Sequence, residues 1–319
     1  MRAEEYLAPE TLAQLAPFEL RAKRIAEGVM NGMHRSPVQG PAVEFASHRH
    51  YAAGDSVRHL DWKVYARSDK LHVKEYRQET NLEVMVLVDA SGSMTYGTLP
   101  VKSGWGGTDA TRQRSAWTKY DHACACAAAI SFLCLHQRDR VGLGIVGPDG
   151  LVANARRSSA KDQWRTIVRL LATQPVAGVA GIGRAIDQVL AQPGGRMLFA
   201  IASDFLGPTE ELRSALALLR HRGHDAMLLG MLDRQEIQFD LDVAAPFEGL
   251  ESEGRLEADA RVVREAYLAE LALHQASVDR IARTCGFDCL WFDTHESVGP
   301  VLASLIARRE AMTRGRKHG

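Results

Sequence analysis

The chain lacks an excess of charge of either sign. Its 319 residues include 39 Lys and Arg and 39 Asp and Glu, so the formal net charge near neutral pH is zero. Overall charge therefore gives no attraction to nucleic acid or to an anionic membrane. The basic residues near the C-terminus form a short run that we interpret as a solvated tail over 311–319. We expect no nucleic-acid partner.

Long hydrophobic runs are also lacking. No apolar stretch approaches the roughly 18 residues that a membrane-spanning helix needs. The first residues, Met1–Tyr6, contain no signal-peptide core. From these two absences we expect a cytoplasmic protein without a membrane span.

Cysteine is scarce, and its spacing fits neither a disulfide framework nor a zinc site. The chain has five cysteines and no Cys-x-x-Cys pair. An odd number without such a pair argues against both a disulfide framework and a zinc site. Cys124, Cys126 and Cys134 fall in an apolar helical stretch, while Cys285 and Cys289 flank a turn. We expect buried, unreactive thiols.

Strands and helices alternate from residue 82 onward. The stretch Leu82–Val88 is almost continuously apolar, which is typical of a strand buried on both faces of a sheet. Further strands are expected at 140–146, 151–155, 197–203, 226–232 and 287–292. Helices are expected at 115–136, 161–172, 182–190, 208–222, 260–285 and 297–309. This order predicts a doubly wound α/β domain over 81–310, with a mainly parallel sheet and helices on both faces.

The first 80 residues predict a small subdomain of a helix and β structure. Apolar residues recur at helical spacing from Pro9 to about Met33, and Leu71–Tyr76 alternates apolar and polar side chains as a half-exposed strand does. The segment is too small for a robust core of its own, so we expect it to pack on the larger domain.

Polar residues follow two of the predicted strands directly. Asp89, Ser91 and Ser93 alternate after the first strand, and Asp204 follows the strand at 197–203. Ligands of open α/β sheets bind beyond the carboxyl ends of the strands, so these side chains are expected to converge on one crevice. Carboxylate and hydroxyl oxygens suit Mg²⁺. Two carboxylates without a cation, an Arg or a Lys between them would repel each other.

This arrangement resembles the von Willebrand factor A fold. Its metal-ion-dependent adhesion site combines Asp-x-Ser-x-Ser after the first strand, a Thr from a second loop and an Asp from a third. Asp89, Ser91 and Ser93 match the first element, and Asp204 matches the third. Ala180 stands where the Thr is expected, and a methyl group cannot ligate. The resemblance implies a degenerate adhesion site with weakly held Mg²⁺. The alternative is a polar turn that binds no ion, in which the hydroxyls cap the next segment and bond to Asp89.

The segment before the first strand carries a denser signature. Its members are Glu44, Arg49, Tyr51, Asp55, Arg58, Asp61, Trp62 and Arg67. Together with the helix and strand order that follows, it looks like the bacterial family called domain of unknown function 58, a von Willebrand factor A-like group. Members of that family resemble accessory proteins encoded beside MoxR-type AAA+ ATPases. The resemblance therefore implies a non-enzymatic adaptor whose partner is such an ATPase.

The residues of this signature also have a structural interpretation. Its arginines alternate with its acidic residues, and guanidinium–carboxylate pairs of this kind can fix an irregular segment through bidentate hydrogen bonds. Trp62 and Tyr51 are expected to supply buried area. We therefore interpret the signature as a structural clasp and not as a catalytic site.

Two glycine-rich segments invite other interpretations. Gly142–Gly147 matches a dinucleotide fingerprint formally, but it lies inside a predicted strand and a turn follows it, so we expect no nucleotide. The loop from Tyr96 to Gly107 has Trp105 near its centre. That loop is either a flexible linker or a partner contact anchored by Trp105.

Three classes of function remain after these observations. The first is a protein-interaction adaptor whose crevice receives an acidic group or a loop of a partner. The second is a metal-dependent hydrolase, although no motif places a His or Lys near the cluster as a general base. The third is a scaffold with a vestigial site. We expect the adaptor.

Overall fold

The computed structural model describes residues 45–50, 62–68, 70–76, 83–100, 116–136, 138–172, 178–241, 244–251 and 254–298. These residues belong to two compact units, one formed by 37–81 and the other containing the chain from Leu82 onward. The expected helices at 9–33 and 297–309 and the tail lie outside the described residues, apart from the first two positions of 297–309. So do Glu44, Tyr51, Asp55, Arg58, Asp61 and Trp105.

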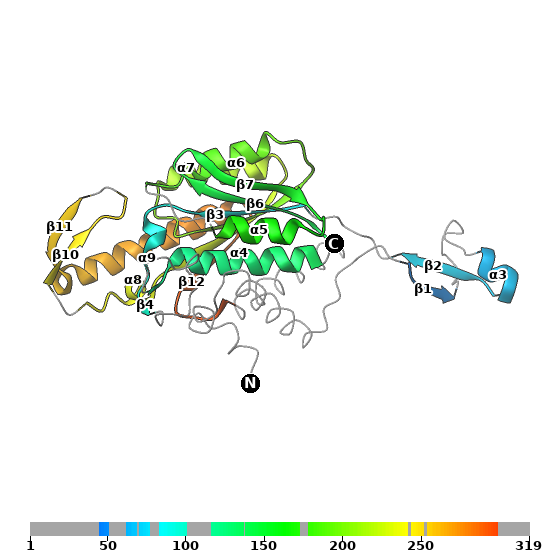
Figure 1. Cartoon of the computed structure of the whole chain (residues 1–319), viewed down its shortest axis with the longest axis horizontal. Coiled ribbons are helices and arrows are strands. Elements are labelled where there is room, and N and C mark those ends of the chain that lie inside the picture. Colours follow the sequence, from blue (N-terminus) through cyan, green and yellow to red (C-terminus); the bar gives the residue numbers. More distant parts are fainter. Residues whose placement is uncertain are drawn as a thin grey trace. The chain divides into compact units, whose positions relative to one another are not determined.

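A six-stranded sheet forms the centre of the larger unit (Figure 1). Its strand order is β12-β9-β8-β3-β6-β7, and each pairing is parallel except that of β6 with β7. The strands are β3 Glu83–Asp89, β6 Arg140–Gly147, β7 Gly150–Ser158, β8 Met197–Ser203, β9 Asp225–Leu232 and β12 Asp288–Asp293. The antiparallel pairing of β7 is shifted in register at two places. The predicted α/β class with a mainly parallel sheet is confirmed.

Helices cover both faces of this sheet because its central strands β3, β8 and β9 are apolar on both faces. Val84, Val86 and Val88 of β3 pack with α4 and α5, whereas Met85 and Leu87 pack with α6, α7 and α9. The helices are α4 Lys119–His136, α5 Gln163–Leu171, α6 Ile182–Leu190, α7 Thr209–His221 and α9 Ala260–Thr284. No helix within the described ranges is long and apolar enough to cross a membrane.

Helix α4 begins at Lys119, four residues later than expected. The preceding Ala116–Trp117 is strand β5, which pairs with β4 at Leu99–Pro100. Thr118 then caps the helix: its backbone N–H donates to Asp121 Oδ2 at 3.0 Å, and its hydroxyl accepts from the Asp121 N–H at 3.1 Å. The cap makes Lys119 the first helical residue, beside the carboxyl edge of the sheet.

Sequence analysis missed the elements between β9 and α9. Helix α8 spans Arg234–Gln238, and β10 (Ala244–Glu248) and β11 (Arg255–Asp259) form an antiparallel hairpin. A capping box of Asp233 and Glu236 starts α8. Phe239 ends it in the left-handed conformation and stacks on Tyr267 of α9 at 4.2 Å between ring centroids. The short helix is thus fixed at both ends.

The smaller unit contains strand β1 Phe45–His50, helix α3 Trp62–Ser68 and strand β2 His72–Tyr76. The strands pair antiparallel, with Arg49 opposite Val73. The expected strand at 71–76 is confirmed. Within this unit Trp62 is 61% exposed and meets Tyr65 edge to face, so the burial expected of it is not found among the described residues of the smaller unit. Arg67 lies in the last turn of α3 and is also exposed.

All five cysteines are free thiols; Cys124, Cys126 and Cys285 are buried as expected, whereas Cys134 and Cys289 are only partly buried. Cys124 and Cys126 are buried in α4. Burial raises the pKa of the Cys126 thiol, and burial, with a smaller contribution from Asp139, raises the pKa of Cys134 to about 12. Both thiols therefore stay protonated and unreactive near neutral pH.

Candidate functional site

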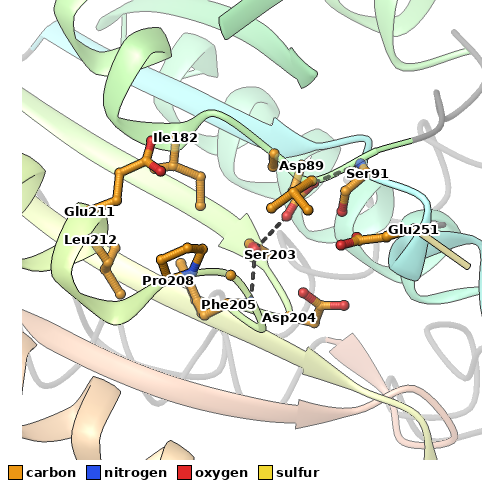
Figure 2. Close-up of a pocket in the computed structure, with 13 residues that line it drawn as sticks. Asp89, Ser91, Ile182, Ser203, Asp204, Phe205, Pro208, Glu211, Leu212 and Glu251 are labelled. Atoms are coloured by element: carbon orange, nitrogen blue, oxygen red, sulfur yellow. Dashed lines mark hydrogen bonds between the residues drawn. The ribbon is translucent and has the colours of Figure 1, made fainter. Parts of the chain in front are cut away.

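The carboxyl ends of β3 and β8 lie side by side and bring the sequence-predicted residues together. Val88 pairs with Ala202, so Asp89 and Asp204 follow neighbouring strands. Asp89, Ser91 and Asp204 line one pocket, which we call the crevice (Figure 2). Its other described lining residues are Val179, Ala180, Ile182, Ser203, Phe205, Gly207, Pro208, Glu211, Leu212 and Glu251.

Asp89 is buried at the floor of the crevice, and both its carboxylate oxygens are bonded. Oδ1 accepts from the Ser91 N–H at 2.7 Å, and Oδ2 accepts from the Ser203 hydroxyl at 2.5 Å. Ser203 Oγ in turn accepts from the Phe205 N–H at 2.9 Å. Burial and the charge of Asp204 raise the pKa of Asp89 to about 7, against the opposing effect of the Ser203 and Ser91 hydrogen bonds. The carboxyl group therefore titrates near neutral pH.

The turn after Asp89 presents the two predicted hydroxyls next to each other. Ser91 Oγ and Ser93 Oγ lie 3.2 Å apart, and Ser93 opens a short 3-10 helix, η3, over Ser93–Thr95. The Gly92 N–H donates to the Gly178 carbonyl at 3.1 Å, which joins the turn to the loop that carries Ala180. That loop thus contacts the turn through its backbone, and Ala180 adds only a methyl group to the crevice.

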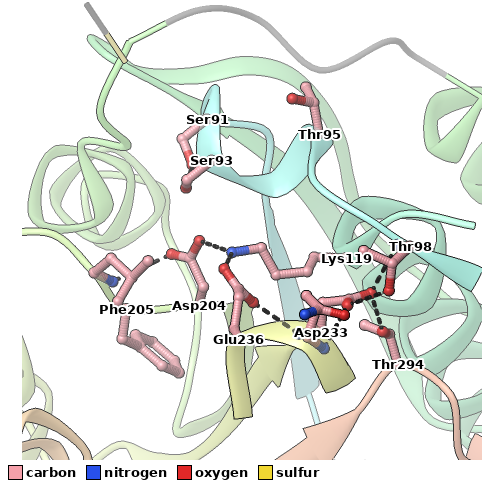
Figure 3. A network of polar contacts seen from close by, with 12 residues as sticks. Ser91, Ser93, Thr95, Thr98, Lys119, Asp204, Phe205, Asp233, Glu236 and Thr294 are labelled. Carbon is pink, nitrogen blue, oxygen red and sulfur yellow. Dashed lines mark hydrogen bonds and ion pairs between the residues drawn. The ribbon is translucent and has the colours of Figure 1, made fainter. Parts of the chain in front are cut away.

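A buried cation, which sequence analysis did not identify, pairs with Asp204. The Lys119 ammonium donates to Asp204 Oδ2 at 2.8 Å and to Glu236 Oε1 at 2.7 Å (Figure 3). The Lys119 side chain is 1% exposed. Burial alone would lower the pKa of Lys119, but the two carboxylates outweigh it and the net shift is upward, so the group is charged. Asp204 Oδ1 accepts from the Leu206 N–H at 3.2 Å, so both its oxygens are bonded.

The polar network continues from Glu236 to the ends of two further segments (Figure 3). Glu236 Oε2 accepts from the Asp233 N–H at 2.7 Å. Asp233 is fully buried and accepts from the Thr98 N–H at 3.0 Å and from the Thr294 hydroxyl at 2.9 Å. Burial favours a higher pKa for Asp233, but hydrogen bonds from Thr98, Gln235 and Thr294 lower it overall. The network therefore links the crevice to β4, α8 and the end of β12.

The tip of the β10–β11 hairpin closes one side of the crevice. The Ser93 N–H donates to Glu251 Oε1 at 3.1 Å across 158 positions of sequence. A Cβ atom added at Gly92 would overlap the carbonyl oxygen of Leu250, so the tip approaches the turn as closely as a glycine permits. The turn is therefore covered by a segment that sequence analysis had left without structure.

We expect Gly92→Ala to detach this tip without disturbing the local backbone. Gly92 has φ −58° and ψ −42°, which alanine adopts freely, so the only obstacle is the Leu250 carbonyl. Loss of the contact with Glu251 should speed hydrogen exchange of the Ser93 amide about tenfold. Gly195→Ala is the control, because nothing lies within 4 Å of its added Cβ. Unchanged exchange in Gly92→Ala would mean that the tip does not protect the turn.

The residues of the crevice do not fit the metal site that the sequence resemblance implies. Both oxygens of Asp89 and both of Asp204 already accept hydrogen bonds, and Ala180 offers no ligand atom. Mg²⁺ needs oxygen ligands in near-octahedral geometry, and here the carboxylates are engaged by protein donors.

Comparison with known proteins assigns the family. The sequence profile described as "Protein of unknown function DUF58" matches residues 47–277. The chain belongs to this family. A relative of this DUF58 chain, the uncharacterized protein Mb1516 of Mycobacterium bovis, is 29% identical over 315 residues, which cover 96% of this chain and 92% of that protein.

Structural comparison of the DUF58 chain matches two solved structures. The conserved hypothetical protein BatB from Bacteroides thetaiotaomicron is 16% identical with a TM-score of 0.38, covering 71% of this chain and 98% of that one. The SpRpn10 VWA domain is 10% identical with a TM-score of 0.36, covering 70% and 94%. The parallel sheet, its helices on both faces and the Asp-x-Ser-x-Ser turn after β3 agree with the von Willebrand factor A-like fold predicted from sequence.

Proposed function

We propose that this chain is a non-enzymatic protein-interaction module that docks a loop of a partner protein at the crevice. The observation that carries the proposal is a group of exposed aliphatic side chains at the rim of a pocket that both polar and apolar residues line. Val179 is 45% exposed, Leu206 46% and Leu250 45%. Val179 lines the pocket, and the other two are chain neighbours of lining residues. Exposed apolar groups gathered around buried polar ones are typical of protein interfaces.

The crevice is too small for a nucleotide or another bulky small molecule, so its size supports binding of a single side chain from a protein loop. Its cavity volume is about 30 Å³, room for about two water molecules. Such a cavity accepts the end of one side chain, while the remaining contacts fall on the rim. The partner would therefore present a loop whose tip enters the crevice and whose flanks cover Val179 and Leu206.

The chemistry of the lining residues supports binding over hydrolysis. Among the described residues that line the crevice there is no His, Lys or Cys to serve as a general base or nucleophile. The Ser203 hydroxyl already donates to Asp89 and accepts from Phe205. A hydrolase would need that hydroxyl, or a metal-bound water, free to attack a substrate.

We propose a MoxR-type AAA+ ATPase as the partner, in the cytoplasm. This choice follows from the resemblance of the segment from Glu44 to Arg67 to accessory proteins encoded beside such ATPases. In this proposal the Asp-x-Ser-x-Ser turn keeps the position of an adhesion site, and the degenerate site docks its partner with little or no help from Mg²⁺.

The proposal predicts that charges placed on the rim weaken docking. Val179→Asp and Leu206→Asp should each weaken binding to the proposed MoxR-type ATPase at least about tenfold. The reason is that each variant buries an unpaired carboxylate in the interface. Binding is measured by co-purification and by titration of the purified ATPase. The matched control is Val262→Asp on α9, whose side chain is 78% exposed and does not line the crevice. It should bind as the natural protein does.

Two results would contradict this proposal. Full binding by both rim variants would place the interface elsewhere on the chain. Turnover of a phosphoester or peptide by the natural protein, lost in Asp89→Ala, would favour the hydrolase.

A further inference from the structure

We infer that Lys119, which pairs with the crevice residue Asp204 without itself lining the pocket, supplies the resident positive charge of the site. Its ammonium group neutralises Asp204 in place of a divalent metal ion, and the site is built to work without one. The inference concerns the ion chemistry of the crevice and stands whether or not a partner docks there.

The charges around Lys119 show what its ammonium does. Asp204 and Glu236 come from the end of β8 and from α8, and the ammonium lies between them at 2.8 and 2.7 Å (Figure 3). Asp204 is 2% exposed and Lys119 1%. Two carboxylates this close require a positive charge, which a lysine supplies as well as a metal does.

The same geometry discourages a second cation. An ion that bound Asp204 from the crevice would share that carboxylate with an ammonium 2.8 Å from one of its oxygens. The other oxygen of Asp204 already accepts from the Leu206 N–H, which leaves fewer lone pairs for a metal ion. Like charges at such separations repel strongly when water is excluded. The site therefore excludes divalent ions for two reasons, since Ala180 removes a ligand and Lys119 occupies Asp204.

A lysine that only holds α8 in place would behave differently. Its removal would destabilise the protein but would give the crevice no affinity for metal. If Lys119 is a resident cation, its removal leaves Asp204 and Glu236 without a positive charge, and a small metal ion can take its place. The response to metal therefore distinguishes the two roles.

The test is a titration of the full chain with Mn²⁺ and Mg²⁺, followed by calorimetry and by the melting temperature Tm. Lys119→Ala removes the charge and leaves space for an ion with its waters. We expect millimolar Mn²⁺ to raise the Tm of Lys119→Ala by about 4 °C, and that of the natural protein by less than about 1 °C. Lys119→Met removes the charge but fills the space, and it should respond less. The double variant Lys119→Ala, Asp204→Asn should lose the response.

A second variant keeps the test decisive if Lys119→Ala does not fold. Ala180→Thr restores the missing hydroxyl while Lys119 stays in place, and it should still bind no Mn²⁺. Mn²⁺ binding by Ala180→Thr, or by the natural protein in a manner lost in Asp89→Ala, would overturn the inference. So would a folded Lys119→Ala variant that gains no affinity for Mn²⁺.

Discussion

Lys119→Met is expected to lower the free energy of unfolding by about 3–5 kcal/mol, the cost of leaving buried charges without their partner. Asp204 and Glu236 would lose the ammonium that bridges them at 2.8 and 2.7 Å, in surroundings that exclude water. Methionine keeps most of the side-chain volume, so the effect comes from the charge and not from a cavity. Urea denaturation at pH 7, followed by circular dichroism, measures the loss.

Arg184→Met is the control for Lys119→Met. Arg184 pairs with Asp149 at 3.0 Å, but both side chains are exposed, and such pairs contribute at most about 1 kcal/mol. Equal losses for the two variants would show that burial of the Lys119 network adds nothing to stability. A loss for Lys119→Met that shrinks in acid would agree with protonation of the two carboxylates relieving their unpaired charge.

Asp89→Asn is expected to stabilise the protein at pH 8, by about 2–4 kcal/mol, and to have little effect near pH 4. The folded state holds the Asp89 proton up to a pKa of about 7, whereas the unfolded chain releases it near 3.8. Folding therefore binds a proton between these values, so stability falls as the pH rises from about 4 to 7. Asparagine carries no charge to bury, and its carbonyl can still accept from the Ser91 N–H.

Asp233→Asn should change the free energy of unfolding at pH 8 in the opposite direction to Asp89→Asn. Hydrogen bonds to the buried Asp233 carboxylate lower its pKa, so its stabilising contribution is present above about pH 4 and is lost as the pH falls through the folded-state pKa. Its replacement should therefore destabilise the protein at pH 8. Urea denaturation of both variants at pH 4.5 and pH 8 checks the signs: the gain from Asp89→Asn should be larger at pH 8, whereas the loss from Asp233→Asn should be about the same at both. A gain from Asp89→Asn that is equal at the two pH values would contradict the raised pKa.

The sequence predicted the sheet well because its central strands are apolar on both faces, and because helices such as α5 and α6 have a clear apolar stripe. It failed between β9 and α9, where the segment is polar and its elements are short. A signal was nevertheless present: Asp233 followed by Glu236 is a capping box placed directly after a strand. Strand β11 of the hairpin has mainly exposed side chains, so alternation of apolar and polar residues could not reveal it.

The candidate site was predictable where strand ends determine it, as for Asp89 and Asp204. The cation that pairs with Asp204 could not be predicted from the sequence. Lys119 lies 85 positions before Asp204, and a lysine in the first turn of a helix is usually solvated. Ser203 was missed for another reason: it belongs to a buried strand, where its hydroxyl gave no local sign of bonding to Asp89. Long-range pairings of this kind become visible only when the sheet order is known.

The edge strand β7 affects whether copies of this protein aggregate in concentrated solution. Its register against β6 is interrupted twice, and it exposes charge at Arg156. Irregular, charged edges resist pairing with the edge of another sheet. The irregular strand β7 therefore hinders edge-to-edge pairing of two copies at this side of the sheet. Because the chain has no net charge, its copies do not repel each other strongly, and this edge strand gives a protection against aggregation that charge does not.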